Sequence, residues 1–297
     1  GIVTKPRLDQ PLPASPMQAS PCWPWFSEVV PRLGAAGFTA AAITIERSSW
    51  QAVDVSQGRL PPMTFKHQVS IVRATIGKHT VLMCSCFAIM REMKLALDKL
   101  FAVPALSMMA SCGVVGVVSS SVQYNWAIRD TYRHFGLMLS EAPGMVGFWR
   151  QSVVPGIAWA FLRASVATGG SLYTGPLVAS QINSALKDFG YKCSDRSLRF
   201  VAGLSVGAAF ALTTQSVHNV TLVAGRMATL GEVTQAPHYT GVALRTAWRE
   251  MGVSMFYRNF VQRMAIQAVT IAALNTFDIM HRPELSAWRM QGVWGAP

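Results

Sequence analysis

Side chains that could carry out chemistry are scattered along this chain. It has six histidines, but no two stand at the spacing of His-Glu-x-x-His, and no glycine-rich loop precedes a Lys-Ser or Lys-Thr pair. Cys84 and Cys86 would point about 200° apart on a helix, too far for one soft metal ion, and the five cysteines give no even disulfide framework. We therefore predict no enzymatic activity, no metal site and no reactive cofactor.

Three ionisable residues, Arg73, His79 and Arg163, lie inside apolar stretches. An ionisable group within a membrane span indicates a functional site by default, so these side chains could line a pathway for an anionic metabolite. An arginine that faces a water-filled vestibule, or whose side chain reaches the membrane interface, explains each of them equally well. Both interpretations stay open at this point.

The composition favours lipid as the surrounding solvent. Hydrophobic residues make up 51% of the 297 residues and charged residues 13%, about half the charge content of ordinary soluble domains. Three runs carry no charge for 29, 26 and 23 residues, between Lys99 and Arg129, Arg199 and Arg226, and Arg163 and Lys187. Roughly 20 helical residues cross a bilayer core, so each run can form a span.

Six membrane spans are predicted, and the length of the apolar runs fits helices better than barrel strands. Their approximate limits are 29–48, 68–92, 103–128, 151–176, 198–225 and 260–281. Three of them contain pairs of small residues that let helices approach closely, Gly34 with Gly37, Gly113 with Gly116, and Gly203 with Gly207.

The net charge of +12 is compatible with a nucleic-acid partner. No basic run or basic helix face stands out, however, and most Lys and Arg residues lie at the ends of the apolar runs, where anionic lipid headgroups are found. We therefore predict membrane lipids, and no nucleic acid, as partners. The start at Gly1, without Met, is compatible with removal of a targeting peptide.

One structural unit occurs more than once in the chain. An amphipathic segment, a glycine break and an aromatic-Arg corner precede the apolar run within 239–278, and the corner at 252–259 matches 144–151 at a spacing of 108 residues. Such repeats indicate copies of one unit, made of an odd span, a polar segment and an even span. The predicted repeats are about 26–98, 99–186 and 187–282, between a proline-rich arm at 1–25 and a tail at 283–297.

With these features the chain resembles the mitochondrial carrier family, in which each of three repeats has an odd transmembrane helix, a matrix-side amphipathic helix and an even transmembrane helix. Both corners match the family pattern of Gly, three variable residues, an apolar or aromatic residue, an aromatic residue, Arg or Lys, and Gly, except at the last position. The first repeat keeps only Thr64-Phe65-Lys66-His67. The resemblance implies an all-α, multi-pass protein of the mitochondrial inner membrane, with six transmembrane helices in three pseudo-repeated pairs.

The resemblance also identifies two gates, and most of their ion pairs are missing here. The matrix-side motif Pro-x-acidic-x-x-basic keeps only Glu46, with Gln123 and His218 at the other two acidic positions, and the opposite motif keeps only Asp278. The substrate contact positions of the even helices map to Ala74-Thr75, Ala158-Trp159 and Ile266-Gln267. None carries a charge, and Trp159 is expected to fill the cavity.

The resemblance therefore implies a carrier-fold protein that has lost transport and is a structural subunit of a large inner-membrane assembly, such as a respiratory complex or an ATP synthase. Its arm and tail would contact other subunits. Alternating access needs two states of similar energy, and helix packing without gate ion pairs favours one. The alternative is a working carrier for a small anionic metabolite, with Arg73, His79 and Arg163 along its pathway.

Family members hold cardiolipin phosphates with backbone amides at the corner glycine and at the start of the even helix. By resemblance, cardiolipin is expected at two corners: Gly144, Arg150 and Gln151, and Gly252, Arg258 and Asn259. The positive N-terminal end of the helix dipole would assist. The other interpretation is that Arg150 and Arg258 anchor in headgroups without a specific lipid.

Overall fold

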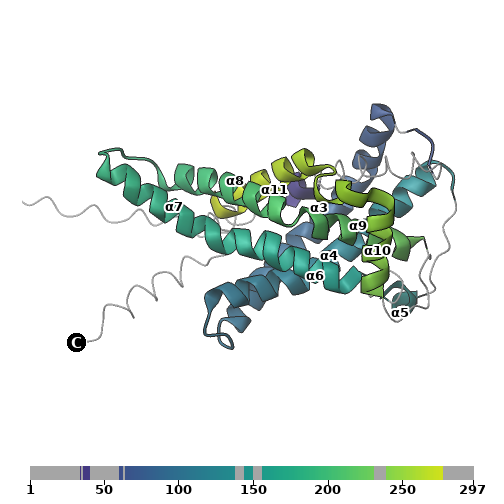
Figure 1. The fold of residues 1–297 in the computed structure, drawn as a ribbon, viewed down its shortest axis with the longest axis horizontal. Helices are drawn as coiled ribbons and strands as arrows, with labels where there is room; N and C mark the ends of the chain where they lie inside the picture. Colours follow the sequence, from purple (N-terminus) through teal and green to yellow (C-terminus); the bar gives the residue numbers. More distant parts are fainter. Residues whose placement is uncertain are drawn as a thin grey trace, which may run out of the picture.

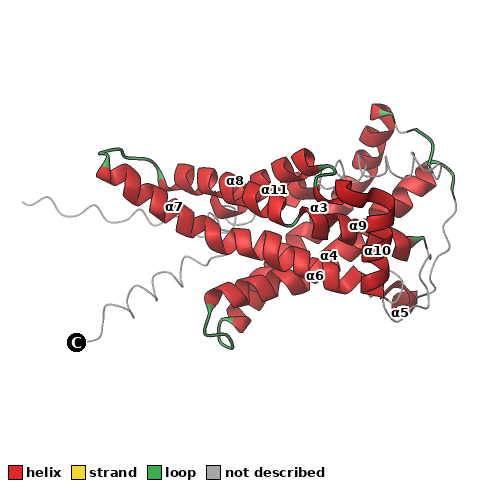
Figure 2. Ribbon diagram, viewed as in Figure 1, coloured by secondary structure: helices red, strands yellow, loops and turns green. Residues whose placement is uncertain are grey.

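The computed structural model describes residues 34, 36–40, 60–62, 64–137, 144–149, 156–230 and 239–276, which form helices joined by turns, with no strand among them (Figure 1, Figure 2). The labelled elements are α3 (Phe65–Leu97), α4 (Pro104–His134), α5 (Gly144–Phe148), α6 (Ile157–Arg163), the π-helix η3 (Ala164–Gly170), α7 (Ser171–Asp188), α8 (Asp195–Thr213), α9 (Gln215–Thr229), α10 (Tyr239–Met251), the 3-10 helix η4 (Gly252–Phe256) and α11 (Phe260–Thr276). The predicted all-α class is confirmed for this part of the chain.

The long helices run back and forth along the long axis of the molecule (Figure 1). The α7–α8 connection lies at the left end of that view and the α3–α4 connection at its lower edge, whereas α5, α9 and α10 lie at the right. The main contacts between helices join α3 with α4, α4 with α6 and η3, α7 with α8, and α8 with α11. The described parts of the predicted spans thus form one helical bundle.

Capping residues set where the helices begin. The Thr64 hydroxyl accepts a hydrogen bond from the His67 N–H at 3.3 Å, and His67 Nδ1 accepts one from the Thr64 N–H at 3.4 Å, which is a capping box. Ser194 Oγ accepts from the Ser197 N–H at 3.1 Å and starts α8. This cap shortens the polar loop predicted at 187–199 to the connection at 189–194. Similarly, α4 continues to His134, through the polar stretch that was expected to follow the span.

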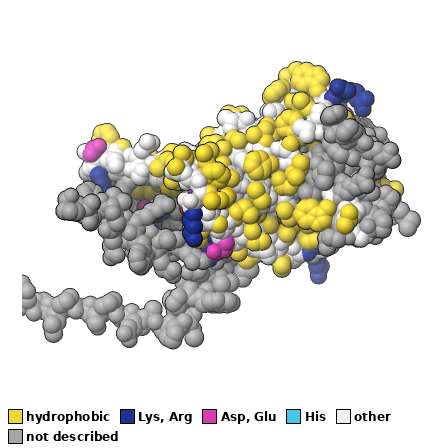
Figure 3. Space-filling view, turned by 90° about the horizontal axis from the view of Figure 1, so that it is seen from below, with side chains coloured by type: hydrophobic (Ala, Val, Ile, Leu, Met, Phe, Trp, Pro, Cys, Tyr) yellow, Lys and Arg dark blue, Asp and Glu magenta, His cyan; other side chains and the backbone are white. Residues whose placement is uncertain are grey.

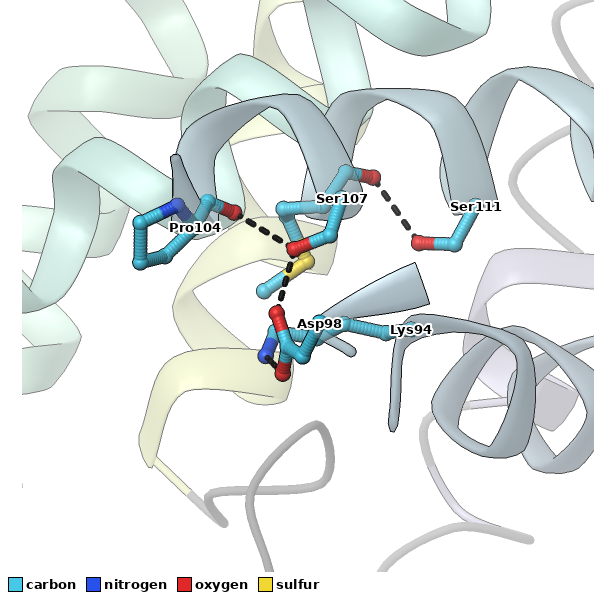
Figure 4. A network of polar contacts seen from close by, with 6 residues as sticks. Lys94, Asp98, Pro104, Ser107 and Ser111 are labelled. Carbon is cyan, nitrogen blue, oxygen red and sulfur yellow. Dashed lines mark hydrogen bonds and ion pairs between the residues drawn. The ribbon is translucent and has the colours of Figure 1, made fainter. Parts of the chain in front are cut away.

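A polar network ties the end of α3 to the first turns of α4 (Figure 4). Lys94 Nζ donates to Asp98 Oδ2 at 2.6 Å, and the Ser107 hydroxyl contacts both the Asp98 carboxylate and the Pro104 carbonyl. Lys94 is buried and lies in the last turn of α3, where a positive charge is stabilised by the helix dipole. The network therefore fixes the angle between the two longest helices.

Glycines allow two pairs of helices to pack closely, as the small-residue spacings predicted. A Cβ atom added to Gly203 of α8 would lie 2.6 Å from Ala272 Cα of α11, and one added to Gly207 would lie 2.8 Å from Ala268 Cα. Gly113 and Gly116 of α4 pack in the same way against α6 and η3, with Ala164 against Gly116. Backbones this close gain dispersion contacts and exclude larger side chains.

The fifth predicted span is bent. α8 and α9 meet at Thr214 with an angle of 66°, although the segment contains no proline. The bend lies next to Ser216, the position that the resemblance described above sets opposite the motif proline. The fourth span is also irregular, because η3 adds one π-helical stretch between α6 and α7.

Both repeated corners contain a glycine in the left-handed region. Gly252, between α10 and η4, has φ 53°, and Gly144, at the start of α5, has φ 72°. A side chain with a Cβ rarely adopts this conformation. The backbone thus explains why glycine occupies the same position in both copies of the corner.

Among the described residues, many apolar side chains are exposed and a number of polar side chains are buried. Val81, Ile89, Val201 and Leu212 are exposed on the outer faces of the helices, whereas the buried residues include polar side chains such as His79, Ser111, Thr214, Asn219 and Arg263. On the face shown in Figure 3, hydrophobic side chains form a broad area and charged ones are few. Water-soluble proteins rarely expose a continuous apolar area of this kind.

No helix among the described residues is, by itself, both long enough and apolar enough to cross a bilayer. The bent pair α8–α9, over Asp195–Thr213 and Gln215–Ala228, has the length and composition of a span when its two helices are taken together, which is fewer than the six spans predicted. The arm at 1–25, the tail at 283–297 and most of the first predicted span lie outside the described residues.

Candidate functional site

A cavity of about 110 Å³ lies between the helices of all three predicted repeats. Its lining includes Thr39, Met83 and Phe87 of the first repeat, residues of α4, α6 and η3, and residues of α9 and α11. The polar side chains that matter most are Ser120, Arg163, His218, Arg263, Gln267 and Thr270. A water molecule needs about 10–15 Å³ on this measure, so the cavity can hold several waters or a small polar solute.

Arg163, at the end of α6, connects α4 and α9 across this cavity. One of its Nη atoms lies 3.3 Å from His218 Nδ1 of α9, and the other donates to the Ser120 hydroxyl of α4. A guanidinium can only donate, so His218 Nδ1 is the acceptor in this contact. His218 is buried.

Arg263 of α11 occupies the bend between α8 and α9. Its Nη1 donates to the Ala211 carbonyl at 2.9 Å and to Gln215 Oε1 at 3.0 Å, and its Nη2 donates to Thr214 Oγ1 at 2.5 Å. The last carbonyls of a helix have no intrahelical partner, and Arg263 provides one at the end of α8. The side chain is 4% exposed, so the bend is held by a buried charge.

The same region of α9 also donates hydrogen bonds to the corner at 252–259, which precedes α11. Gln215 Nε2 donates to the Arg258 carbonyl at 2.6 Å, and Asn219 Nδ2 donates to the Met255 carbonyl at 2.7 Å. We call Thr214, Gln215, Asn219 and Arg263 the bend cluster. Its four buried polar side chains connect α8, α9, η4 and α11.

A buried ion pair joins α9 to α10. Arg226 Nη2 lies 2.6 Å from Glu250 Oε1, and the two side chains are 1% and 9% exposed. The apolar residues around it, including Val223, Met227, Ala247 and Met251, form one cluster between the two helices. The ion pair and the apolar cluster together hold α10 against α9.

The structure separates the three predicted pathway residues. Arg163 lines the cavity. Arg73 is exposed on α3, and His79 is buried between α3 and α4 with its ring stacked on Trp126 at a centroid distance of 5.9 Å. Lys78 forms an ion pair with Asp130 beside the same ring. Arg73 and His79 do not belong to the cavity lining.

The predicted contact positions give a mixed result. Ile266 and Gln267 line the cavity, and Gln267 Nε2 donates to the Ala167 carbonyl of η3 at 3.2 Å. The expectation that Trp159 fills the cavity is wrong, because its Nε1 donates to the Thr240 carbonyl at 2.9 Å and its ring packs against the α9–α10 cluster. Among the gate positions, His218 turns towards Arg163; Glu46, Asp278 and the side chain of Gln123 lie outside the described residues.

The predicted lipid corners are described in part. Gly144 is exposed, Gly252, Arg258 and Asn259 are half-buried, and Asn259 has φ 55°. The N–H groups of Tyr257 and Arg258 donate to the Ser254 carbonyl at 3.1 and 2.8 Å, so these two amides are occupied within the turn. Arg150 and Gln151 lie outside the described residues.

Sequence reasoning missed the bend cluster and the Arg226–Glu250 pair. Arg263 stands at the edge of the last apolar run, where an arginine is usually an interfacial residue. The available signal was Gln215 and Asn219, two amides four residues apart on one helical face, within a run of 26 uncharged residues. Among the described residues there is no group of three or more His, Cys, Asp or Glu side chains that could hold a metal ion.

Comparison of the chain with protein-family models, with curated proteins and with solved structures found no match.

Proposed function

We propose that this chain is a carrier-like, six-span protein of the mitochondrial inner membrane that has lost transport and is a structural subunit of a large membrane complex. The spans would be the first predicted helix, α3, α4, the segment from α6 to α7, the bent pair α8–α9, and α11. The pseudo-repeated order of elements, the two left-handed corner glycines and the transverse helix α10 support this arrangement.

The distribution of polarity supports lipid around the bundle. Exposed Val81, Ile89, Val201 and Leu212 would face acyl chains, and polar side chains turn inward. A helix with one polar face towards a cavity has a low mean hydropathy although its outer face is apolar. This accounts for helices such as α3, which is 33 residues long but carries Lys78, His79 and Lys94 on faces turned to its neighbours.

The observation that carries the structural role is how the arginines beside the cavity are used. Arg163 bonds to α4 and α9, and Arg263 bonds to the carbonyl and side chains of the α8–α9 bend. A transporter has to change these helix contacts during each cycle, which would break buried, charge-assisted hydrogen bonds. These contacts favour a single arrangement of the helices.

Uptake and assembly assays together test the proposal. The purified chain in liposomes is expected to give no saturable uptake of phosphate, carboxylates or nucleotides. In mild detergent, the chain from its native membrane is expected to run in a large complex at a fixed ratio to other subunits. Saturable uptake that is lost in Arg163→Ala would overturn the structural role.

A second candidate is a carrier for a small anionic metabolite, and one feature favours it. Thr270 Oγ1 is buried in the cavity wall and has no hydrogen-bond partner within the described part of the chain, and it shares that cavity with Arg163 and Gln267. A small carboxylate could bond to all three. A carboxylate that binds the purified protein, and binds at least tenfold more weakly to Thr270→Val, would favour this candidate.

The expected lipid partner is cardiolipin at the two corners, Gly144 with Arg150 and Gln151, and Gly252 with Arg258 and Asn259. The left-handed glycines support an open backbone turn at each corner. Arg258→Gln is expected to lower the amount of cardiolipin that co-purifies with the protein, measured by mass spectrometry. Unchanged cardiolipin content in Arg258→Gln would count against this corner as a specific site.

A further inference from the structure

α10 has two faces of different chemistry. Its inner face carries Ala243, Ala247 and Met251, which are buried against α9, and Glu250, which pairs with Arg226. Its outer face carries Leu244, Arg245, Trp248 and Arg249, all exposed, at the i, i+1, i+4 and i+5 positions of one helical side. Trp248 is 52% exposed, which is a large apolar area to leave in water.

The apolar part of this face continues beyond α10. Val253, Phe256 and Tyr257 in and after η4, and Val261 at the start of α11, are also exposed. In Figure 1 α10 lies across the end of the bundle, transverse to the long helices. Exposed apolar residues thus continue along the chain from α10 to the start of a helix that we propose to cross the membrane.

Tryptophan and leucine next to arginines are the residues that settle at the boundary between headgroups and acyl chains. The rings and aliphatic side chains enter the acyl boundary, and guanidinium groups bind lipid phosphates, often in a bidentate manner. A helix lying flat in this layer needs such a mixed face. A purely aqueous contact would leave Leu244 and Trp248 hydrated at a cost in free energy.

We propose that the outer face of α10, formed by Leu244, Arg245, Trp248 and Arg249, is an interfacial binding surface for the headgroups of anionic lipids. The surface is distinct from the corner glycines, and it rests on the proposed membrane location of the chain. The two arginines supply the charge complementarity, and Trp248 sets the depth of the helix. α10 would hold the end of the bundle at a fixed level in the bilayer.

The test places a fluorophore on α10 of the full chain in nanodiscs. Leu244→Cys, with Cys22 and Cys193 replaced by Ser, is labelled with an environment-sensitive dye. Quenching is measured with headgroup nitroxides on phosphatidylglycerol and on phosphatidylcholine. The expected result is quenching by both, stronger for the anionic lipid. Arg245→Gln with Arg249→Gln is expected to lower the ratio of anionic to zwitterionic quenching by about fivefold or more, towards one.

Matched neutralisation at the other end of the bundle provides the control. Lys192→Gln with Arg196→Gln removes two exposed charges near the α7–α8 connection and is expected to leave the ratio at residue 244 unchanged. An equal fall in this control would overturn the assignment to α10, because it would mean a general charge effect. Absence of quenching by either lipid, with the protein stably inserted in the nanodisc, would also overturn it and favour a protein partner on this face. Failure of the chain to enter nanodiscs at all would instead contradict the proposed membrane location.

Discussion

Arg263, which the sequence analysis did not single out, makes several buried hydrogen bonds. Its guanidinium bonds to Ala211, Thr214 and Gln215 at once. We predict that Arg263→Met lowers the free energy of unfolding by about 2 kcal/mol or more, because it leaves buried acceptors without a donor. The measurement is denaturant unfolding in detergent micelles. Arg73→Met, on the exposed side of α3, is the control and should change stability by less than about 0.5 kcal/mol.

The ion pair of Arg226 with Glu250 gives a second prediction for single residues. Glu250→Gln removes the carboxylate from a guanidinium that is 1% exposed, and we expect a loss of about 3–5 kcal/mol. The double change Arg226→Met with Glu250→Leu should recover much of that loss, because it also removes the buried charge. Equal destabilisation by the single and the double change, measured in the same unfolding assay, would contradict a dominant role for charge burial.

α8 packs closely on α11 over an extensive contact. Gly203→Ala and Gly207→Ala are each expected to destabilise the protein by about 1–3 kcal/mol, because the added methyl group meets the backbone of α11 and cannot be accommodated by a side-chain movement. Gly77→Ala is the matched control, since a Cβ atom there meets nothing within 4 Å on α3. Alanine has the higher helix propensity, so this control should be neutral or slightly stabilising.

At the level of helices, the sequence was a good guide where a pattern is local. The first residues of α3, α4 and α11 lie at or near the predicted starts of the spans, because the charge-free runs that indicate them are local in sequence, whereas α4 extends past the predicted end. The small-residue pairs correctly indicated close helix packing. The bend at Thr214 was not predicted, because it depends on Arg263, which is 49 residues away. Trp159 was assigned to the cavity from its register alone, whereas a bond to Thr240, 81 residues later, turns it towards α10.

For the molecule as a whole, the apolar exterior can be tested directly. Val81, 68% exposed in the middle of α3, is expected to tolerate Arg poorly if acyl chains surround it, at a cost of about 2.5–3.5 kcal/mol in membrane insertion. Leu100→Arg, in the turn between α3 and α4, should insert normally. Glycosylation-tag insertion assays measure both changes. Equal tolerance of the two substitutions would contradict a lipid-facing middle and a water-facing turn.

The origin of the bend between α8 and α9 affects how the chain is made. A proline would bend the helix as soon as the segment emerged, whereas the bend here requires a side chain from a helix that is synthesised later. In the proposed membrane location, α8 and α9 would therefore enter the bilayer before their shape is fixed, and only the arrival of α11 would complete it. A chain truncated before Arg263 should accordingly be a good substrate for membrane proteases, and α11 would act as the quality checkpoint of its biogenesis.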